Sequence, residues 1–487
     1  MTAQFANNDK TMNTKALRQK ILDLAIHGKL VPQDPNDEPA SVLLERIKAE
    51  KERLIKEGKI KRSKQSKTAW DKQHYPFELP DGWCWTTIDN IYFVTKLAGF
   101  EYTEYFTKDA ISPTNPVPIV RAQNVKMGRF IENNNEAITV ELSEQLLRSA
   151  LYKDCLLMTF IGAGVGDTCI FHSNKRNHLA PNVAKIEPFN EHINMEYALF
   201  FFMSSLGQLG VTNISKSTAQ ASLSMATIRE LVIPIPPIKE QSRITNEVTK
   251  WFSLIDCIEE NRNNLQETIK KAKSKILDLA IHGKLVPQDP MDEPASELLK
   301  RINPNAEITC DNQHYRNLPK GWCLINGKSL FEPMKSTKPN GTFFKYIDID
   351  SIDNKRQRIN KIKELKSKEA PSRACRYTEK GDIVFSMVRP YLRNIAKVTD
   401  GDCIASTGFY ICRTSKLMLS DFCYYLMLSD YVVNGLNQFM KGDNSPSINK
   451  SNIEDWHYPL PPYKEQQRIV NAISKAFTTL DAISENL

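Results

Sequence analysis

The strongest hydrophobic pattern in the chain follows residue 238, near its middle. Apolar residues recur there at alternating steps of four and three, interrupted once by Arg262: Ile244, Val248, Trp251, Ile255, Ile258, Leu265, Ile269, Ala272, Ile276 and Leu279. This spacing is typical of a coiled-coil seam, because an ordinary amphipathic helix drifts off a strict heptad within a few turns. We expect one helix from Lys239 to His282, about 66 Å long, ended by Gly283 and Pro287.

Both ends of the chain carry the same heptad. Near the C-terminus it matches the front of the central helix and runs through Ile469, Ile473, Ala476, Leu480, Ile483 and Leu487. Near the N-terminus it matches the back of that helix and runs through Leu17, Ile21 and Leu24. Laid end to end, the two terminal helices would rebuild a second long helix. We expect it to run antiparallel to the first and to share its seam.

The heptads belong to longer repeats. The stretch KILDLAIHGKLVPQDPNDEPASVLLERI begins at Lys20 and recurs from Lys275 with three differences, which are Asn36/Met291, Val42/Glu297 and Glu45/Lys300. The block QHYPFELPDGWCW recurs as QHYRNLPKGWCL, and PIPPIKEQSRI recurs as PLPPYKEQQRI. Between these two blocks, each half carries a segment with little identity to the other. This order is that of a two-fold repeat that has been circularly permuted.

The two variable segments share an order of elements. In the first, VPIVRAQNV, DCLLMTFIG and TCIFH predict strands, and NMEYALFFFMSSLGQLG predicts a buried helix. In the second, FFKYIDIDSI, GDIVFSMV and FYICR predict strands, and LSDFCYYLMLSDYVVNGL predicts the helix. We therefore expect an α+β protein in which two mixed α/β domains are separated by a pair of long antiparallel coiled-coil helices, with pseudo-two-fold, circularly permuted repeats.

The same patterns divide the chain into six expected regions. They are an N-terminal helical region 1–47 that pairs with the C-terminal helix, a charged linker 48–73, a first variable domain 74–237, a central coiled-coil region 238–302, a second variable domain 313–462 and a C-terminal helix 463–487.

Composition narrows the class. The 487 residues are 41% hydrophobic and 25% charged, which is typical of a globular protein of two to four units. We find no apolar run near the roughly 18 residues that span a bilayer and no signal peptide, and the scattered cysteines form no C-x-x-C pair. We expect a cytoplasmic protein. The net charge of +8 permits a nucleic-acid partner without demanding one.

Polar and basic residues at strand ends and in loops are candidates for DNA contact, because their side chains bind phosphates and base edges. Solvated loop polarity explains any one of them equally well. In the first variable domain the candidates are Arg121, Asn124, Lys126, Arg129, Lys216, Thr218 and Gln220. In the second they are Arg389, Tyr391, Arg393, Lys441, Asn444 and Ser445. The basic run from Lys59 to Lys67 fits an exposed linker better.

Catalytic signatures are weak or missing. FIGAGVGD at 160–167 resembles an S-adenosylmethionine loop, but no helix is predicted after it and the other half has no matching glycines, so a glycine-rich turn is the better interpretation. Asp348 and Asp350 would share one strand face and Asp353 the other, which disfavours a metal site. We find neither an Asn-Pro-Pro-aromatic tetrapeptide nor a phosphate loop. The sequence predicts a non-catalytic chain without a metal or cofactor of its own.

Taken together, the recurring blocks resemble those of the specificity subunits of type I DNA restriction–modification systems. The resemblance covers essentially the whole chain and rests on PIPPIKEQSRI and PLPPYKEQQRI, on LPDGWCW and LPKGWCL, and on the duplicated ILDLAIHGKLVPQ. It implies that each variable domain is a target recognition domain for half of a bipartite DNA site. It also implies that the helices fix the gap between the halves and dock two modification subunits.

The resemblance places the chemistry on partners of this chain. Modification subunits would use S-adenosylmethionine to methylate adenine N6, and restriction subunits, where present, would use ATP and Mg²⁺. Two linked recognition domains would gain from a raised effective concentration once one of them is bound. The target bases and the spacer length do not follow from the sequence.

Three other classes fit parts of the pattern. They are an autonomous sequence-specific DNA-binding regulator, a coiled-coil adapter without a DNA role, and a fused methyltransferase, which the missing tetrapeptide disfavours. Tight specific DNA binding by the chain alone would indicate the regulator. The cassettes are also more alike than packing requires, from which we hypothesise that recognition segments are exchanged by recombination.

Overall fold

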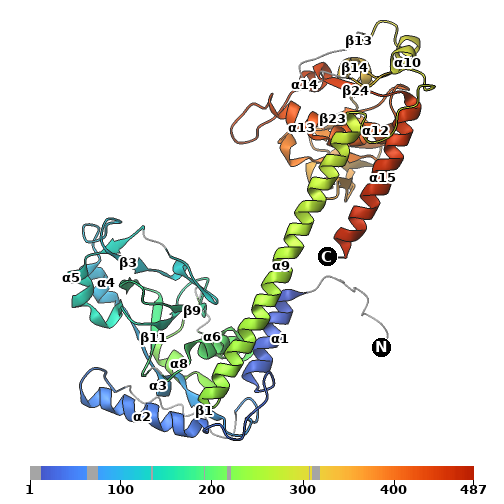
Figure 1. Cartoon of the computed structure of the whole chain (residues 1–487). Helices are drawn as coiled ribbons and strands as arrows, with labels where there is room; N and C mark the ends of the chain where they lie inside the picture. The colour runs from blue at the N-terminus through green and yellow to red at the C-terminus, as the bar shows by residue number, and fades with distance from the viewer. Residues whose placement is uncertain are drawn as a thin grey trace. The chain divides into compact units, whose positions relative to one another are not determined.

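Helix α9 (Ile238–Ile281) is the longest element of the structure, a computed structural model that describes residues 13–62, 75–132, 135–190, 192–215, 221–306, 308–309 and 318–486. Its bounds lie one residue from those that the heptad predicts at each end. The chain divides into an N-terminal unit (Met12–Glu260) and a C-terminal unit that begins at Asn261. Helix α9 starts in the first unit and ends in the second (Figure 1).

The N-terminal unit contains short strands between helices. Its helices before α9 are α1 (Thr14–Ile26), α2 (Ala40–Lys56), α3 (Ile88–Ile91), α4 (Gly99–Tyr105), α5 (Val140–Gln145), α6 (Met195–Met203), α7 (Ser205–Ile214) and α8 (Met225–Glu230). Its strands are β1 (Cys84–Thr87), β2 (Tyr92–Lys96), β3 (Val117–Val120), β4 (Val125–Lys126), β5 (Arg129–Phe130), β6 (Ala137–Ile138), β7 (Ala150–Leu151), β8 (Cys155–Thr159), β9 (Thr168–Phe171), β10 (Asn177–Leu179), β11 (Val183–Pro188) and β12 (Val232–Ile235).

The C-terminal unit follows the same plan. Its helices after α9 are α10 (Ala295–Ile302), α11 (Gly327–Leu330), α12 (Ser420–Leu428), α13 (Asp430–Asn437), α14 (Lys450–Asp455) and α15 (Tyr463–Glu485). Its strands are β13 (Ile308–Thr309), β14 (Cys323–Asn326), β15 (Phe343–Ile347), β16 (Ile352–Asp353), β17 (Arg358–Ile359), β18 (Lys363–Lys366), β19 (Ala374–Thr378), β20 (Ile383–Ser386), β21 (Ile395–Lys397), β22 (Cys403–Ser406), β23 (Phe409–Cys412) and β24 (His457–Leu460).

Sheet topology shows that the two units have one fold. The order β6-β3-β10-β7 in the first matches β18-β15-β22-β19 in the second, and in each sheet only the two central strands pair in parallel. Strands β11-β8-β9 match β23-β20-β21, and the hairpin β4-β5 matches β16-β17. The pair β1-β12 matches β14-β24. The predicted correspondence of the two variable segments is thus a correspondence of strand pairing.

Each terminal helix packs against its own part of α9 and runs in the opposite direction (Figure 1). In the N-terminal unit, the Arg18 guanidinium lies over the Phe252 ring, 5.1 Å from its centroid, and pairs with Asp256 at 2.6 Å. In the C-terminal unit, Lys273 lies over Phe477 at 5.1 Å and pairs with Asp481. The same contacts in both units are what a circularly permuted repeat requires.

A second matched cluster holds each variable domain to its helix. The indole nitrogen of Trp83 donates to the buried carboxylate of Glu240 at 3.1 Å, and Trp322 donates to Glu465 at 3.0 Å. One helical turn further, Arg243 and Arg468 pair with buried Asp37 and Asp292 at 2.7 and 2.6 Å. Burial raises the pKa of Glu240 and of Glu465 above the usual glutamate range. These residues explain why GW and KEQxR recur in the sequence.

The structure differs from the predicted seam on one side of α9. Ile244, Val248, Ile255 and Ile269 are buried there, as are Ile469 and Ile473 on α15, while Ile276, Leu279 and Leu480 are half-buried. Trp251, Ile258 and Leu265, the alternate positions of the heptad, are 41%, 42% and 39% exposed. The described contacts of α1 and α15 each cover one face of α9. The heptad spacing alone therefore did not show which of its apolar positions would be buried.

Three predicted elements, two helices and a strand, end earlier than their hydrophobic runs. Each long buried helix is broken by a serine, Ser204 or Ser429, whose side chain caps the following helix. The strand predicted over FFKYIDIDSI ends at Ile347, and Asp348 caps a short turn by accepting from the amide of Ser351. Asp348 and Asp350 therefore do not share a strand face. The described residues include no cluster of three metal-ligating side chains.

Candidate nucleic-acid interface

In the C-terminal unit, three loops meet at one end of strand β20. We call them together the C-terminal three-loop surface: the hairpin 353–358, the turn 387–394 and the loop 439–447. The Asn354 amide donates to the carbonyl of Leu392 at 3.1 Å, which joins the hairpin to the turn. The Arg389 backbone amide donates to the carbonyl of Pro446 at 2.8 Å, which joins the turn to the loop.

The N-terminal unit builds an equivalent N-terminal three-loop surface from the hairpin 125–130, the turn 160–167 and, from the third loop, the described residues 221–223. The Gly128 amide donates to the carbonyl of Thr168 at 2.8 Å, which fixes the hairpin beside the turn. The Gly162 amide donates to the carbonyl of Ala221 at 3.3 Å, in the same place as the Arg389 contact. The predicted residues Lys216, Thr218 and Gln220 lie outside the described residues.

Cations are exposed on both surfaces. Lys126 and Arg129 stand on the first hairpin. The second hairpin carries Lys355, Arg356 and Arg358, and the neighbouring loop adds exposed Lys441, Asn444 and Ser445 beside Asp443. Within the residues that the structure describes, no ion pair is formed by the hairpin cations of either surface. Such side chains suit phosphate contact, because their charge is available and no internal partner must be displaced.

Sequence reasoning missed the second hairpin. Lys355, Arg356 and Arg358 lie in NKRQR, directly after the strand predicted over FFKYIDIDSI. The signal was there, since a polar, basic run between two apolar segments is typical of an exposed turn.

Three of the predicted DNA contacts hold the fold together in the structure. Asn124 is buried, and its amide group accepts from the Arg121 amide and donates to the carbonyl of Ile131, both at 2.8 Å. The Arg121 guanidinium donates to Glu136, which raises its pKa. Arg393 donates to the carbonyl of Leu428 and to Asp430. Their polar groups are already satisfied inside the protein, which a single sequence does not reveal.

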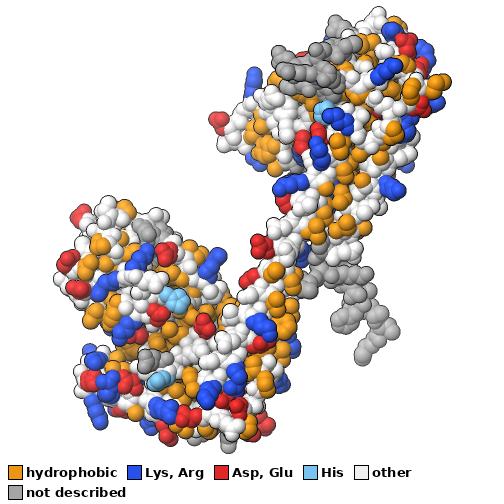
Figure 2. All heavy atoms as spheres, in the orientation of Figure 1, with side chains coloured by type: hydrophobic (Ala, Val, Ile, Leu, Met, Phe, Trp, Pro, Cys, Tyr) orange, Lys and Arg blue, Asp and Glu red, His pale blue; other side chains and the backbone are white. Residues whose placement is uncertain are grey.

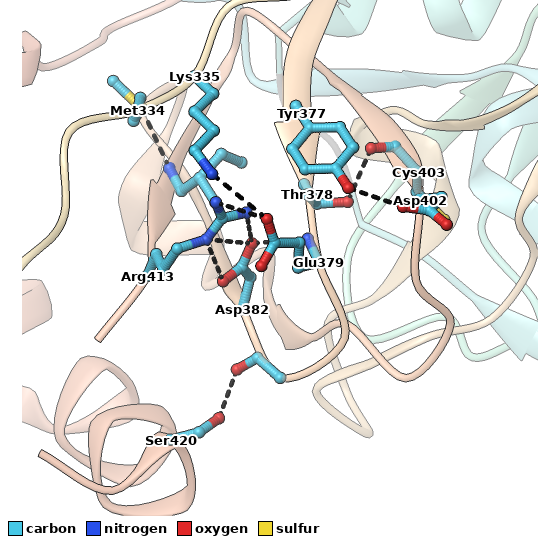
Figure 3. Close-up of polar contacts among 12 residues, drawn as sticks. Met334, Lys335, Tyr377, Thr378, Glu379, Asp382, Asp402, Cys403, Arg413 and Ser420 are labelled. Carbon is cyan, nitrogen blue, oxygen red and sulfur yellow. Dashed lines mark hydrogen bonds and ion pairs between the residues drawn. The ribbon is translucent and has the colours of Figure 1, made fainter. Parts of the chain in front are cut away.

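An ion-pair network supports the sheet that carries the 387–394 turn (Figure 3). Arg413, directly after β23, forms three hydrogen bonds from its guanidinium to Asp382 and a further contact to Glu379, at 3.0 Å. Asp382 directly precedes β20 and is buried, and hydrogen bonding to it raises the pKa of Arg413. Lys335 adds a weaker contact to Glu379 at 3.6 Å. The network thus fixes β20 at the end opposite to the turn.

Comparison with known proteins agrees with this arrangement. The family model for the type I restriction modification DNA specificity domain matches residues 100–267 and 323–487. The chain is 28% identical to the EcoAI specificity subunit of Escherichia coli, over 96% of this chain and 90% of that protein. It is 27% identical to the EcoEI specificity subunit of the same species, over 97% and 90%.

Two solved structures are also similar. The HsdS subunit from Thermoanaerobacter tengcongensis shares 32% identity over 35% of this chain and 45% of that chain, with a TM-score of 0.33. The S subunit from M. genitalium shares 15% identity over 83% and 92%, with a TM-score of 0.32. None of the described helices has the length and apolar character to cross a membrane. On the family match over both variable domains, the chain belongs to the type I restriction–modification DNA specificity family, whose members are the subunits that recognise the DNA target.

Proposed function

We propose that each three-loop surface reads one half of a bipartite DNA target. The observation that carries this proposal is the repetition: two domains of one fold place a hairpin and a turn at matching positions. In both domains the turn is joined to the third loop by a matching backbone hydrogen bond, and the hairpin exposes cations. The hairpin cations Lys126, Arg129, Lys355, Arg356 and Arg358 would hold phosphates. Sequence would be read by the less similar turns and third loops, where Asn444 and Ser445 can meet base edges.

A second part of the proposal concerns the helices. Trp251, Leu254 and Ile258 are exposed at helical spacing on α9, and Figure 2 shows hydrophobic side chains along this helix. Exposed apolar groups at this spacing on a helix suit a protein partner. From the family resemblance we take that partner to be a modification subunit, one for each half of the chain. S-adenosylmethionine would act there, beside a target adenine extruded from the duplex, because a stacked base cannot be reached.

The test of the first part is charge reversal in the assembled complex. Lys355→Glu together with Arg356→Glu should lower affinity for target DNA at least tenfold and reduce the salt dependence of binding. Lys416→Glu, an exposed lysine beyond the far end of β20, makes the same kind of charge change and should leave affinity unaltered. Unchanged affinity in the hairpin variant would contradict the proposed interface.

Domain exchange tests the division of labour. The target is first found by mapping N6-methyladenine in DNA from cells that carry the whole system. Residues 74–237 are then replaced by the corresponding segment of a relative, and only one half of the methylated motif should change. A change in both halves would contradict the assignment of one half-site to each domain. Specific binding by the purified chain alone, equal to that of the complex, would favour an autonomous regulator.

A further inference from the structure

The two turns at the centres of the three-loop surfaces are equally long, are anchored to the sheet by matching backbone hydrogen bonds, and carry different side chains. We call 160–167 the glycine turn and 387–394 the arginine turn. The amide of Thr159 donates to Asp167 O as that of Ser386 donates to Asn394 O, at 2.9 and 3.1 Å. The amides of Phe160 and Met387 donate to Asn182 O and Gly408 O at 2.9 and 2.8 Å. Gly162 therefore corresponds to Arg389, and Gly166 to Arg393.

The backbone conformation makes arginine unexpected at these two positions. Gly162 and Gly166 have φ angles of 113° and 90°, which favour glycine. Arg389 and Arg393 occupy the left-handed region at 47° and 53°. A side chain at such an angle is strained and persists only where the surroundings fix it. Two strained residues four positions apart indicate a turn whose shape is held for a purpose.

The arginine side chains themselves supply the fixing contacts. The Arg389 guanidinium donates to the carbonyl of Asn444 at 2.7 Å, and Arg393 binds Asp430 and the carbonyl of Leu428. Pro390 is buried between them. Both arginines are therefore positioning residues of the turn, because the guanidinium of each donates to an acceptor in another segment.

The tip that they hold is apolar and exposed. Tyr391 is 47% exposed and Leu392 is 41% exposed, beside the basic hairpin that Asn354 joins to the turn. At the matching places the glycine turn has Gly164 and a half-buried Val165 that packs against the core. A Cβ at Gly164 would lie 2.8 Å from the Asp167 carboxylate, which would have to move for a side chain to fit there.

We propose that Tyr391 and Leu392 form a rigid wedge that packs against an unstacked base step in the half-site read by the C-terminal domain. The inference rests on the proposed DNA-binding role of the C-terminal three-loop surface. A fixed aromatic and aliphatic pair beside phosphate-binding cations has the chemistry for this contact, because bases stack on aromatic rings and apolar wedges open base steps. The N-terminal domain, with no such tip, reads its half-site without a wedge.

The experiment uses the complex with its modification subunits and duplexes of the mapped target, each with 2-aminopurine at one position. The wild-type complex should raise fluorescence at a step in the C-terminal half-site that is distinct from the methylated adenine. Tyr391→Ala with Leu392→Ala should abolish that rise and weaken binding about tenfold, the scale of one lost stacking contact. Tyr391→Phe should retain the fluorescence rise and near wild-type affinity.

Phe343→Ala, which removes another exposed aromatic of the same unit, is the matched control and should change neither signal. The wedge is refuted if the double variant keeps the fluorescence rise, or if it loses only assembly with the modification subunits. The wedge is refuted as well if the wild-type complex gives no fluorescence rise, even when the double variant binds DNA more weakly. If charge reversal at Lys355 and Arg356 weakens binding while the tip variants behave as wild type, the interface stands and the wedge alone fails.

Discussion

In the N-terminal unit, the residue after β3 is Arg121, which donates to Glu136. In the C-terminal unit, the residue after the matching strand β15 is Asp348, which accepts from Lys363. The two pairs link the same two places of the fold with opposite polarity. Burial opposes ionisation of Asp348, but hydrogen bonds from Lys363 and Ser351 hold its pKa below the usual aspartate range. Both units thus place an ion pair at this position, with the acid and the base exchanged.

The residues that hold each variable domain to its helix, by contrast, do not differ between the units. Trp83 and Trp322, Glu240 and Glu465, and Asp37 and Asp292 are identical in type and contact in the two units. The difference between these two groups of residues is burial: partly exposed pairs beside the loops add little stability and can vary, whereas buried partners cannot be replaced singly. Two domains can therefore bind different DNA sequences while they present the same contacts to the helices.

Removing Asp382 should cause the largest loss of stability, and it should affect the C-terminal unit alone. Arg413, whose side chain is 11% exposed, pairs with the buried Asp382, and loss of one partner of a buried ion pair costs about 3–5 kcal/mol. Asp382→Ala should therefore raise hydrogen exchange across β20 and β23 without altering the N-terminal unit. Asp154→Ala, at the matching but half-exposed position beside Ser173, should cost much less. Equal losses would mean that Asp382 has no special role.

The two faces of α9 should separate stability from assembly. Ile255→Ala removes a buried side chain beside α1 and should destabilise the N-terminal unit by about 3 kcal/mol. Ile258→Ala, three residues on and exposed, should leave thermal unfolding nearly unchanged and weaken binding of a modification subunit. Unfolding temperature and a pull-down with that subunit measure the two effects. Equal unfolding temperatures of the two variants would contradict the observed packing.

The two turns should respond differently to side chains at positive φ. Gly166→Ala places a Cβ 2.7 Å from Val211 at a φ of 90° and should cost about 2 kcal/mol. Arg389→Gly relieves strain but removes a hydrogen bond, so its unfolding free energy should change by less than about 1 kcal/mol while the turn exchanges amide hydrogens faster. An Arg389→Gly variant with an unaltered exchange rate would show that its guanidinium does not fix the turn.

The matched glutamates should give the smallest effect, and an equal one in both units. Because burial raises their folded-state pKa, the folded chain binds protons more tightly than the unfolded chain. Their stabilising contribution is complete below the unfolded glutamate pKa and is lost as pH rises through the higher folded-state values. Glu240→Gln and Glu465→Gln should each flatten the pH dependence of unfolding in that window. A steeper dependence in either variant would contradict the raised pKa.

Much of the fold could be predicted from sequence because its signals are local and repeated. The heptad gave α9 to within one residue at each end, and the cassettes indicated the permuted symmetry that the matched Arg18 and Lys273 contacts display. The helix breaks at Ser204 and Ser429 were missed because apolar residues continue on both sides of each serine. An added Cβ at Gly207 would lie 2.0 Å from the carbonyl of Phe201, an approach that periodicity does not encode.

The candidate site was less predictable. Lys126, Arg129 and Lys441 are exposed on the three-loop surfaces, whereas Asn124 and Arg393 use their polar groups inside the protein. Strand-end position alone cannot separate these outcomes, because an inward and an outward polar side chain have the same sequence signature. The role of the arginines at 389 and 393 became visible only from their φ angles and their partners.

The anchoring of Arg389 and Arg393 also limits how specificity can be engineered. Each reaches a segment distant in sequence: Asn444 and Pro446 in the third loop, and Leu428 and Asp430 at the break between α12 and α13. A graft that moves only 387–394 into another member of the family would separate both guanidinium groups from the acceptors that they have in this chain. The smallest part of this domain that could be transplanted is therefore discontinuous, and its three segments have to be transferred together.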